Sequence, residues 1–364
     1  MKLIDSPLFT FDQKRSATLF YALRLKGKKD MRNNEEDIME QSQRSNFLDG
    51  VPQTIAPEVE SVVHHIREGR FQRSLALVAG LSSLMSGLEV AYEHYRGSYG
   101  QRIMYSPVVL SPALCAAGMW AFKSRRAART VLPIVSSAVL ADCLIGFGFH
   151  IRGIARKPGG WRIPVTNVVM GPPVFAPLLF GISGYLGVVA CFLRREDAPD
   201  GGWLPGAARP LPKWTKLLPG GWRQEEITVD QDLREGRFQK HMALATAGSA
   251  FFSGVEALYS HYKNNFKYKA QWTPVMIAPV LMGTAFGAMK SRKIAHTALP
   301  AVSALAVADG AIGFYYHARG VKQRPGGAKH LLYNIMYGPP VLAPLLFAAC
   351  GFLGLLASFL RRER

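Results

Sequence analysis

The hydrophobic pattern divides most of the chain into eight apolar segments, each about as long as a helix that crosses a lipid bilayer. They cover residues 74–92, 105–122, 131–149, 168–193, 241–259, 272–289, 298–316 and 335–360. An α-helix rises about 1.5 Å per residue, so roughly 18 to 25 residues cross the ~30 Å hydrocarbon layer. Helices of this length in soluble proteins usually carry a polar face. The pattern therefore predicts an all-α, polytopic membrane protein with about eight transmembrane helices.

The eight segments form two copies of one pattern of four. The sequence REGRFQ at 67–72 returns at 234–239, and Arg195-Glu196 returns as Arg362-Glu363, both at an offset of 167 with no gap between. Four is an even number of crossings, so both copies enter the membrane from the same side. We therefore expect an internal repeat of two tandem four-helix bundles, at 67–196 and 233–364, with parallel topology about an axis along the membrane normal.

Two polar segments lie outside the copies. Residues 1–66 are highly charged, and we expect a cytoplasmic extension that docks a protein partner. Residues 197–232 join the copies, are rich in Pro and Gly, and carry Trp203, Trp214 and Trp222. Tryptophan prefers the membrane–water interface, so this linker is expected to lie along the membrane surface.

The composition agrees with a membrane protein and explains the charge without nucleic acid. Of the 364 residues, 49% are hydrophobic and only 19% are charged, and the formal net charge is +19. The Lys and Arg residues near the spans cluster at their ends, 18 on the side of the termini and linker against 13 on the opposite side. The positive-inside rule predicts a multi-pass protein with both termini and the linker in the cytoplasm.

Ionisable side chains inside a bilayer span are costly and are functional candidates by default. The first and third spans of each copy keep two such residues apiece. They are Glu89, His94, Asp142 and His150 in the first copy, and Glu256, His261, Asp309 and His317 in the second. Four residues of matching type at one offset indicate a site in each copy.

The histidines suit an axially ligated cofactor. The first and third spans cross in the same direction, so His94 and His150 lie at similar height on helices that are diagonal neighbours in an up-down bundle. His261 and His317 form the same pair. Such a pair can hold a b-type haem from both sides. Space for the macrocycle would come from Gly87, Gly146, Gly148, Gly254 and Gly313. Arg152 and Arg319, just beyond the second histidine, could pair with the propionates.

We therefore expect an electron-transfer subunit of a membrane complex with one haem b in each copy, and three alternatives remain open. A membrane metalloenzyme would use a non-haem metal ion; its ligands would be Glu89, His94, His150, Glu256, His261 and His317. A proton-coupled transporter would use Glu89, Asp142, Glu256 and Asp309 as proton or ion sites. A scaffold subunit would use all of them for packing. One ion cannot join all four residues of a copy, because Asp142 lies eight residues, about 12 Å, below His150.

Repeated prolines fall at the level of the histidines. The second span carries Pro107 and Pro112, and the fourth carries Pro172, Pro173 and Pro177; all five recur in the second copy. Proline bends or breaks a helix, and broken backbone at membrane depth is tolerated where it is buried or lines a cavity. We expect an outer-leaflet pocket in each copy.

The remaining potential ligands form no repeated set. Cys115, Cys143, Cys191 and Cys350 have no CxxC spacing, so we expect neither a disulfide framework nor a Cys-based zinc site. Five histidines have no counterpart in the other copy and are expected at the surface. They are His64, His65, His241, His296 and His330.

Overall fold

A computed structural model describes residues 54, 56–197 and 228–363. The chain splits into two compact units, Met1–Val62 and Val63–Arg364, and the helices discussed below belong to the second. Helix α2 (Ala56–Arg67) is the first described element. Most of the expected docking extension and of the tryptophan-rich linker lies outside the described residues, so both stay predictions.

The described part of the chain consists of helices and their connections, with no strand among these residues. The first half, residues 67–196, contains α3 (Gln72–Arg96), η1 (Arg102–Tyr105), α4 (Ser106–Lys123), α5 (Arg125–Arg129), α6 (Val131–Ala155), η2 (Gly160–Arg162), α7 (Pro164–Val169) and α8 (Ala176–Phe192). The second half, residues 233–364, contains α10 (Gln239–Lys263), η4 (Lys269–Trp272), α11 (Thr273–Lys290), α12 (Arg292–His296), α13 (Ala298–Lys322), η5 (Gly327–His330), α14 (Leu331–Tyr337) and α15 (Ala343–Phe359). The first residue of each α-helix in the second half follows that of its counterpart at the same offset as the sequence repeat.

Within the described ranges, five helical segments are long and apolar enough to cross a membrane. They are Gln72–Arg96, Arg102–Lys123, Val131–Ala155, Lys269–Lys290 and Arg292–Lys322. This confirms the predicted class, an all-helical, multi-pass membrane protein whose apolar helices suit contact with lipid.

The fourth segment of each half is not the continuous helix that the hydrophobic pattern predicted. In the first half, α7 ends at Val169 and α8 begins only at Ala176, and α8 has 17 residues. The intervening sequence contains Pro172 and Pro173, which have no amide hydrogen to continue a helical ladder. The same break separates α14 from α15.

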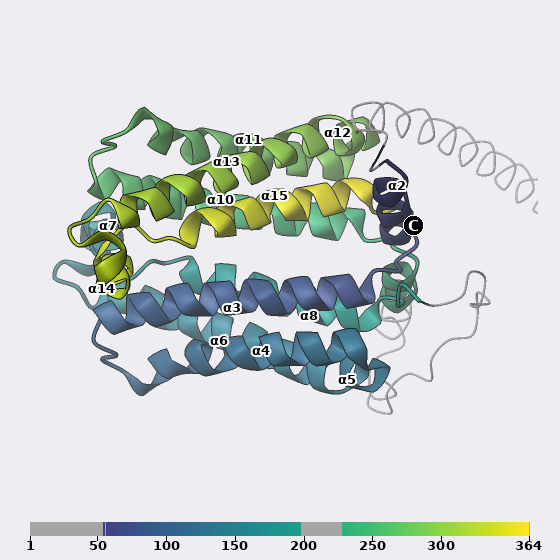
Figure 1. Cartoon of the computed structure of the whole chain (residues 1–364), viewed down its shortest axis with the longest axis horizontal. Coiled ribbons are helices and arrows are strands. Elements are labelled where there is room, and N and C mark those ends of the chain that lie inside the picture. Colours follow the sequence, from purple (N-terminus) through teal and green to yellow (C-terminus); the bar gives the residue numbers. More distant parts are fainter. Residues whose placement is uncertain (1–53, 55, 198–227, 364) are drawn as a thin grey trace, which may run out of the picture. The chain divides into compact units, whose positions relative to one another are not determined.

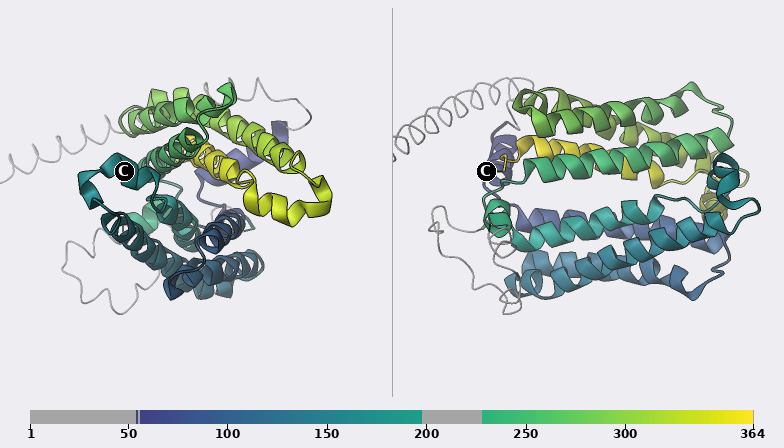
Figure 2. Two further views of the ribbon diagram at one scale, coloured as in Figure 1. Left: turned by 90° about the vertical axis from the view of Figure 1, so that its left-hand side faces the viewer. Right: turned by 180° about the vertical axis from the view of Figure 1, so that it is seen from behind.

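Within each half, the first and third helices are diagonal neighbours. Helix α3 packs against α4 and α8, and α6 packs against the same two helices. In the second half, α10 and α13 each pack against α11 and α15. The halves meet where α8 lies against α10 and α3 against α15, and the long helices of this unit run side by side (Figures 1 and 2).

Small residues allow this close packing, as is usual in membrane proteins, where lipid gives little hydrophobic drive for association. A Cβ atom added at Gly118 of α4 would lie 2.4 Å from the carbonyl oxygen of Ala76 on α3. One added at Gly351 of α15 would lie 2.5 Å from the carbonyl oxygen of Ser303 on α13. The backbones therefore touch where these glycines stand.

The repeated REGRFQ motif is a backbone junction. Its glycines, Gly69 and Gly236, have positive φ angles of +67° and +71°. A Cβ atom at Gly69 would lie 2.6 Å from the carbonyl oxygen of Arg234, so the two motifs contact each other across the halves. The amide of Arg194, just after α8, donates to the carbonyl of Gly69 at 2.8 Å. The motif thus joins the ends of one bundle and also joins the two halves.

The repeated Arg-Glu pair caps the first helix of its own half. Glu196 accepts hydrogen bonds from the amides of Arg73 and Ser74, at 3.0 and 2.8 Å. Glu363 accepts from the amides of Lys240 and His241, both at 3.0 Å. A carboxylate at a helix N-terminus satisfies free amides and complements the helix dipole. The cap comes from the far end of the half in sequence, so local sequence could not reveal it.

Candidate functional site

The clearest pairing of predicted site residues is in the second half. The imidazole rings of His261 on α10 and His317 on α13 have centroids 6.5 Å apart and planes at 88°. Nδ1 of His317 lies 2.5 Å from the carbonyl oxygen of Pro340. Because a carbonyl only accepts, Nδ1 carries the hydrogen and Nε2 keeps a free lone pair.

In the first half, backbone carbonyls orient both histidines. Nδ1 of His150 lies 2.5 Å from the carbonyl oxygen of Pro173, and Nδ1 of His94 lies 2.7 Å from that of Met104. His94 is within electrostatic range of His150. An Nδ1–H bond to a backbone carbonyl is the usual way in which a protein orients a histidine that binds a metal through Nε2.

The proline break supplies the carbonyl groups that orient two of these histidines. Pro173 and Pro340 stand between the two parts of the fourth segment, where the carbonyls have lost their helical donors. His150 and His317 replace those donors. The prolines and histidines were predicted to lie at the same level, and Pro173 and Pro340 in fact contact His150 and His317 directly.

The repeated glutamates point to the opposite half, which sequence reasoning missed. Oε1 of Glu256 on α10 accepts from the amide of Phe175, the N-cap residue of α8, at 3.2 Å. Glu89 on α3 accepts from the backbone of Leu342, the N-cap residue of α15. Each glutamate thus caps the broken fourth helix of the other half. The repeat relates Phe175 to Leu342 but carries no signal that the partners are exchanged.

The alternative metal-ligand sets are not brought together. Among the described residues, no group of three or more His, Cys, Asp and Glu side chains could hold a metal ion. Glu89 and Glu256 are instead engaged by the backbone of the other half, as N-terminal caps of α15 and α8. His261 and His317 remain a close pair.

The repeated aspartates lie against the start of the preceding long helix. Ser106, the first residue of α4, has its Oγ 2.5 Å from Oδ1 of Asp142 on α6. In the second half, Thr273, the first residue of α11, bonds to Asp309. Each aspartate thus contacts the first residue of the preceding long helix.

The expected space for a macrocycle beside the glycines is mostly filled. A Cβ atom at Gly87 would lie 1.9 Å from Oγ of Ser111, and one at Gly254 would lie 2.5 Å from Cβ of Ala278. Proline side chains of α8 and α15 occupy the space beside Gly146 and Gly313, and only Gly148 has no atom within 4 Å. The interpretation of these glycines was wrong at four of five positions, because they serve helix packing.

Arg152 and Arg319 are exposed near the ends of α6 and α13, two residues past the second histidine of each pair. The four cysteines are free. Of the histidines expected at the surface, His296 is half-buried, and its Nδ1 lies 3.1 Å from the carbonyl oxygen of Ser358.

The comparisons with known proteins give no further guide. No protein-family model, curated protein or solved structure matches the chain. The function therefore has to be inferred from the geometry of this multi-pass helical membrane protein itself.

Proposed function

We propose that this chain is an integral membrane electron-transfer subunit with a bis-histidine b-type haem, or a related axially ligated cofactor, near the outer face of each half. The pairing of His261 with His317 carries the proposal. A metal ion between two imidazoles, with bonds of about 2 Å, holds the ring centroids roughly 6 Å apart, and these centroids are 6.5 Å apart. Such a cofactor would supply one-electron chemistry, and the exposed Arg152 and Arg319 would meet its acidic groups.

The packing limits where a macrocycle could lie. Gly87 stands seven residues below His94, and Gly146 four residues below His150. Because neighbouring side chains fill the space beside these glycines, the ring would lie outward of them, at the level of the imidazoles. The chain's own part is to orient the second histidine of each pair, His150 or His317, through a carbonyl of the proline break.

The proposal includes two tandem bundles with eight crossings and parallel topology. The constant offset between the helix bounds of the two halves and the same neighbour pattern in both support it. In each half, the broken pair α7 and α8, or α14 and α15, makes the fourth crossing. The termini and the linker then face the cytoplasm, and the N-terminal extension docks a redox partner there.

Site-specific loss of cofactor tests the proposal. The variants His94→Ala and His261→Ala should each remove about half of the haem or metal bound to the purified protein, and the double variant should remove all of it. His330→Ala is the matched control, since His330 is exposed and has no counterpart in the other half. A cofactor content that stays unchanged in the double variant would end the bis-histidine assignment.

A proton-coupled carrier is the second candidate, favoured by the discontinuous fourth helix. In carriers, half-helix ends at membrane depth face the substrate or ion, and here intramembrane glutamates cap such ends. This candidate would be favoured if the purified protein contains neither haem nor metal and, reconstituted in lipid vesicles, acidifies the vesicle interior when solute is added.

A further inference from the structure

Asp142 and Asp309 belong to hydrogen-bonded chains that the proposed electron transfer does not use. Oγ of Ser106 lies 2.5 Å from Oδ1 of Asp142 and 2.7 Å from the carbonyl oxygen of Ile103. In the second half, Oγ1 of Thr273 lies 2.8 Å from the carbonyl oxygen of Ala270 and also bonds to Asp309. The two halves therefore build the same chain of carboxyl group, hydroxyl group and carbonyl group.

The hydrogen count of this chain favours one direction. A hydroxyl group has one hydrogen, and a backbone carbonyl only accepts. With the hydrogen of Ser106 directed to Ile103, the hydrogen in the 2.5 Å contact comes from the carboxyl group of Asp142. A carboxylate at Asp142 would instead leave the one hydrogen of Ser106 to be shared between two acceptors. The same count applies to Asp309 and Thr273.

The surroundings agree with neutral acids. His94 on α3 is the one titratable group that acts electrostatically on Asp142 from another helix in the described part of the chain, and Asp309 has no such group there. Cys143 is the sequence neighbour of Asp142. No described ion pair joins either aspartate to Lys or Arg. An unpaired carboxylate within a span is costly, and protonation removes that cost.

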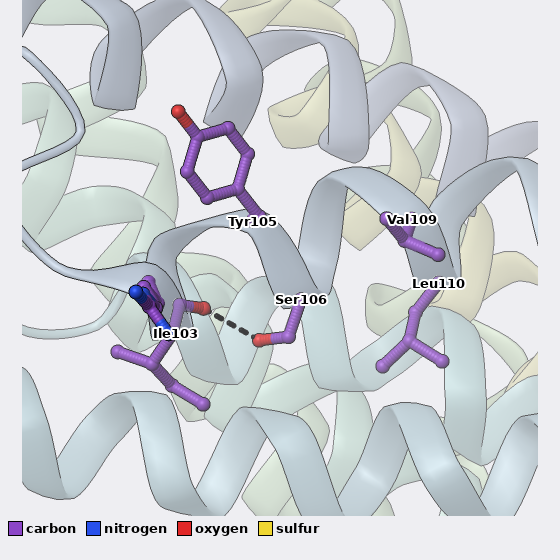
Figure 3. Close-up of a pocket in the computed structure, with 6 residues that line it drawn as sticks. Ile103, Tyr105, Ser106, Val109 and Leu110 are labelled. Atoms are coloured by element: carbon purple, nitrogen blue, oxygen red, sulfur yellow. Dashed lines mark hydrogen bonds between the residues drawn. The ribbon is translucent and has the colours of Figure 1, made fainter.

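A surface groove lies beside Ser106, the hydrogen-bond partner of Asp142. Its lining residues are Arg102, Ile103, Tyr105, Ser106, Val109 and Leu110 (Figure 3). Ser106 both lines this groove and touches Asp142, so its hydroxyl group is the link between the half-buried acid and the groove.

We infer that Asp142 and Asp309 are a pair of proton-binding sites, both loaded in this conformation, and that Ser106 connects Asp142 to the surface groove. Binding is a simple protonation, in which a carboxylate takes a proton from water in the groove and becomes a carboxylic acid. The inference does not depend on a bound cofactor.

Infrared spectroscopy of the protein in lipid at neutral pH tests the inference. The carbonyl stretching band of protonated carboxylic acids should lose equal intensity in Asp142→Asn and in Asp309→Asn, and twice that intensity in the double variant. Asparagine can still donate to the hydroxyl group, so thermal unfolding should stay close to wild type. Wild-type and double-variant spectra that coincide in this region would overturn the inference, and the single variants give the same test if the double variant does not fold.

The variant Ser106→Ala tests the link. This variant removes the acceptor of the Asp142 proton. Half of the band intensity that depends on the two aspartates should therefore shift to the frequency of a carboxylic acid without a hydrogen-bond acceptor. The proton of Asp142 should also exchange more slowly in D2O. Thr273→Val is the matched change in the second half of the chain, and it should shift the remaining part of the band, which comes from Asp309. An unchanged band position in Ser106→Ala would contradict the assigned direction of the hydrogen bond.

Discussion

At the scale of single residues, the repeated polar side chains divide by partner. Backbone carbonyls orient three of the four histidines, the aspartates meet hydroxyl groups, and Glu89 and Glu256 meet the backbone of the other half. Residue type and offset alone could predict that these positions matter. They could not predict the partners, because Glu89 and Leu342, or Glu256 and Phe175, are brought together only by the packing of the two halves.

The carboxylate of Glu363 gives the fold a pH dependence. Burial opposes its ionisation, but hydrogen bonds from the side chain of His241 and from the amides of Lys240 and His241 outweigh burial and hold its pKa below the usual value of 4.5. A lowered pKa contributes stability that is present above the unfolded-state pKa and is lost as the pH falls through the folded-state pKa.

We therefore expect Glu363→Gln to lower the stability at neutral pH by about 1 kcal/mol, the usual size of a helix cap. The difference from wild type should shrink as the pH falls below 4.5, as followed by thermal unfolding. Glu196→Gln, the matched variant, should show a similar loss at neutral pH. A difference that grows on acidification would refute the cap.

At the scale of elements, the hydrophobic pattern gave a good account of the first three helices of each half and failed at the fourth. The predicted segment 131–149 lies within α6 (Val131–Ala155). The segment 168–193 includes the break before Ala176. The apolar residues of this segment have the composition of a membrane span. Whether Pro172 and Pro173 break the helix depends on whether other groups can satisfy the hydrogen bonds of the backbone amides and carbonyls that the break leaves free. Here His150 and Glu256 do so.

The exchanged caps predict a crossed response in hydrogen–deuterium exchange. Glu256→Ala should increase exchange at the amides of Phe175 and Ala176 in the first half, because it removes their acceptor. Glu89→Ala should increase exchange at Leu342 in the second half instead. Each removes a cap worth about 1 kcal/mol, so exchange through local opening should rise roughly fivefold. Faster hydrogen–deuterium exchange confined to the half that carries the substitution would contradict capping between the halves.

At the scale of the whole molecule, the constant offset of the sequence repeat anticipates that of the helix bounds. The contact between the halves could not be anticipated. Gly69 and Gly236 belong to the clearest repeated motif, REGRFQ, but nothing in the sequence of this motif indicates that its two copies contact each other. Local sequence determines which residues form helices, whereas the contact between the halves depends on backbones that approach closely at glycine.

Parallel topology predicts equal labelling of equivalent positions. In intact cells, a membrane-impermeant thiol reagent should label cysteines placed at Arg162 and Lys329, and should not label those placed at Arg126 and Lys293. All four positions are exposed, and the unaltered chain gives the background from its own free cysteines. An inverted repeat would instead give opposite labelling of Arg126→Cys and Lys293→Cys.

The visible absorption spectrum of the purified full-length protein tests the proposed pairing of imidazoles. We expect a Soret band that shifts on reduction with dithionite, with two haems per chain. The double variant that carries both His150→Ala and His317→Ala should lack this band. A colourless wild-type protein that takes up no haem when haem is supplied during membrane insertion would contradict the claim.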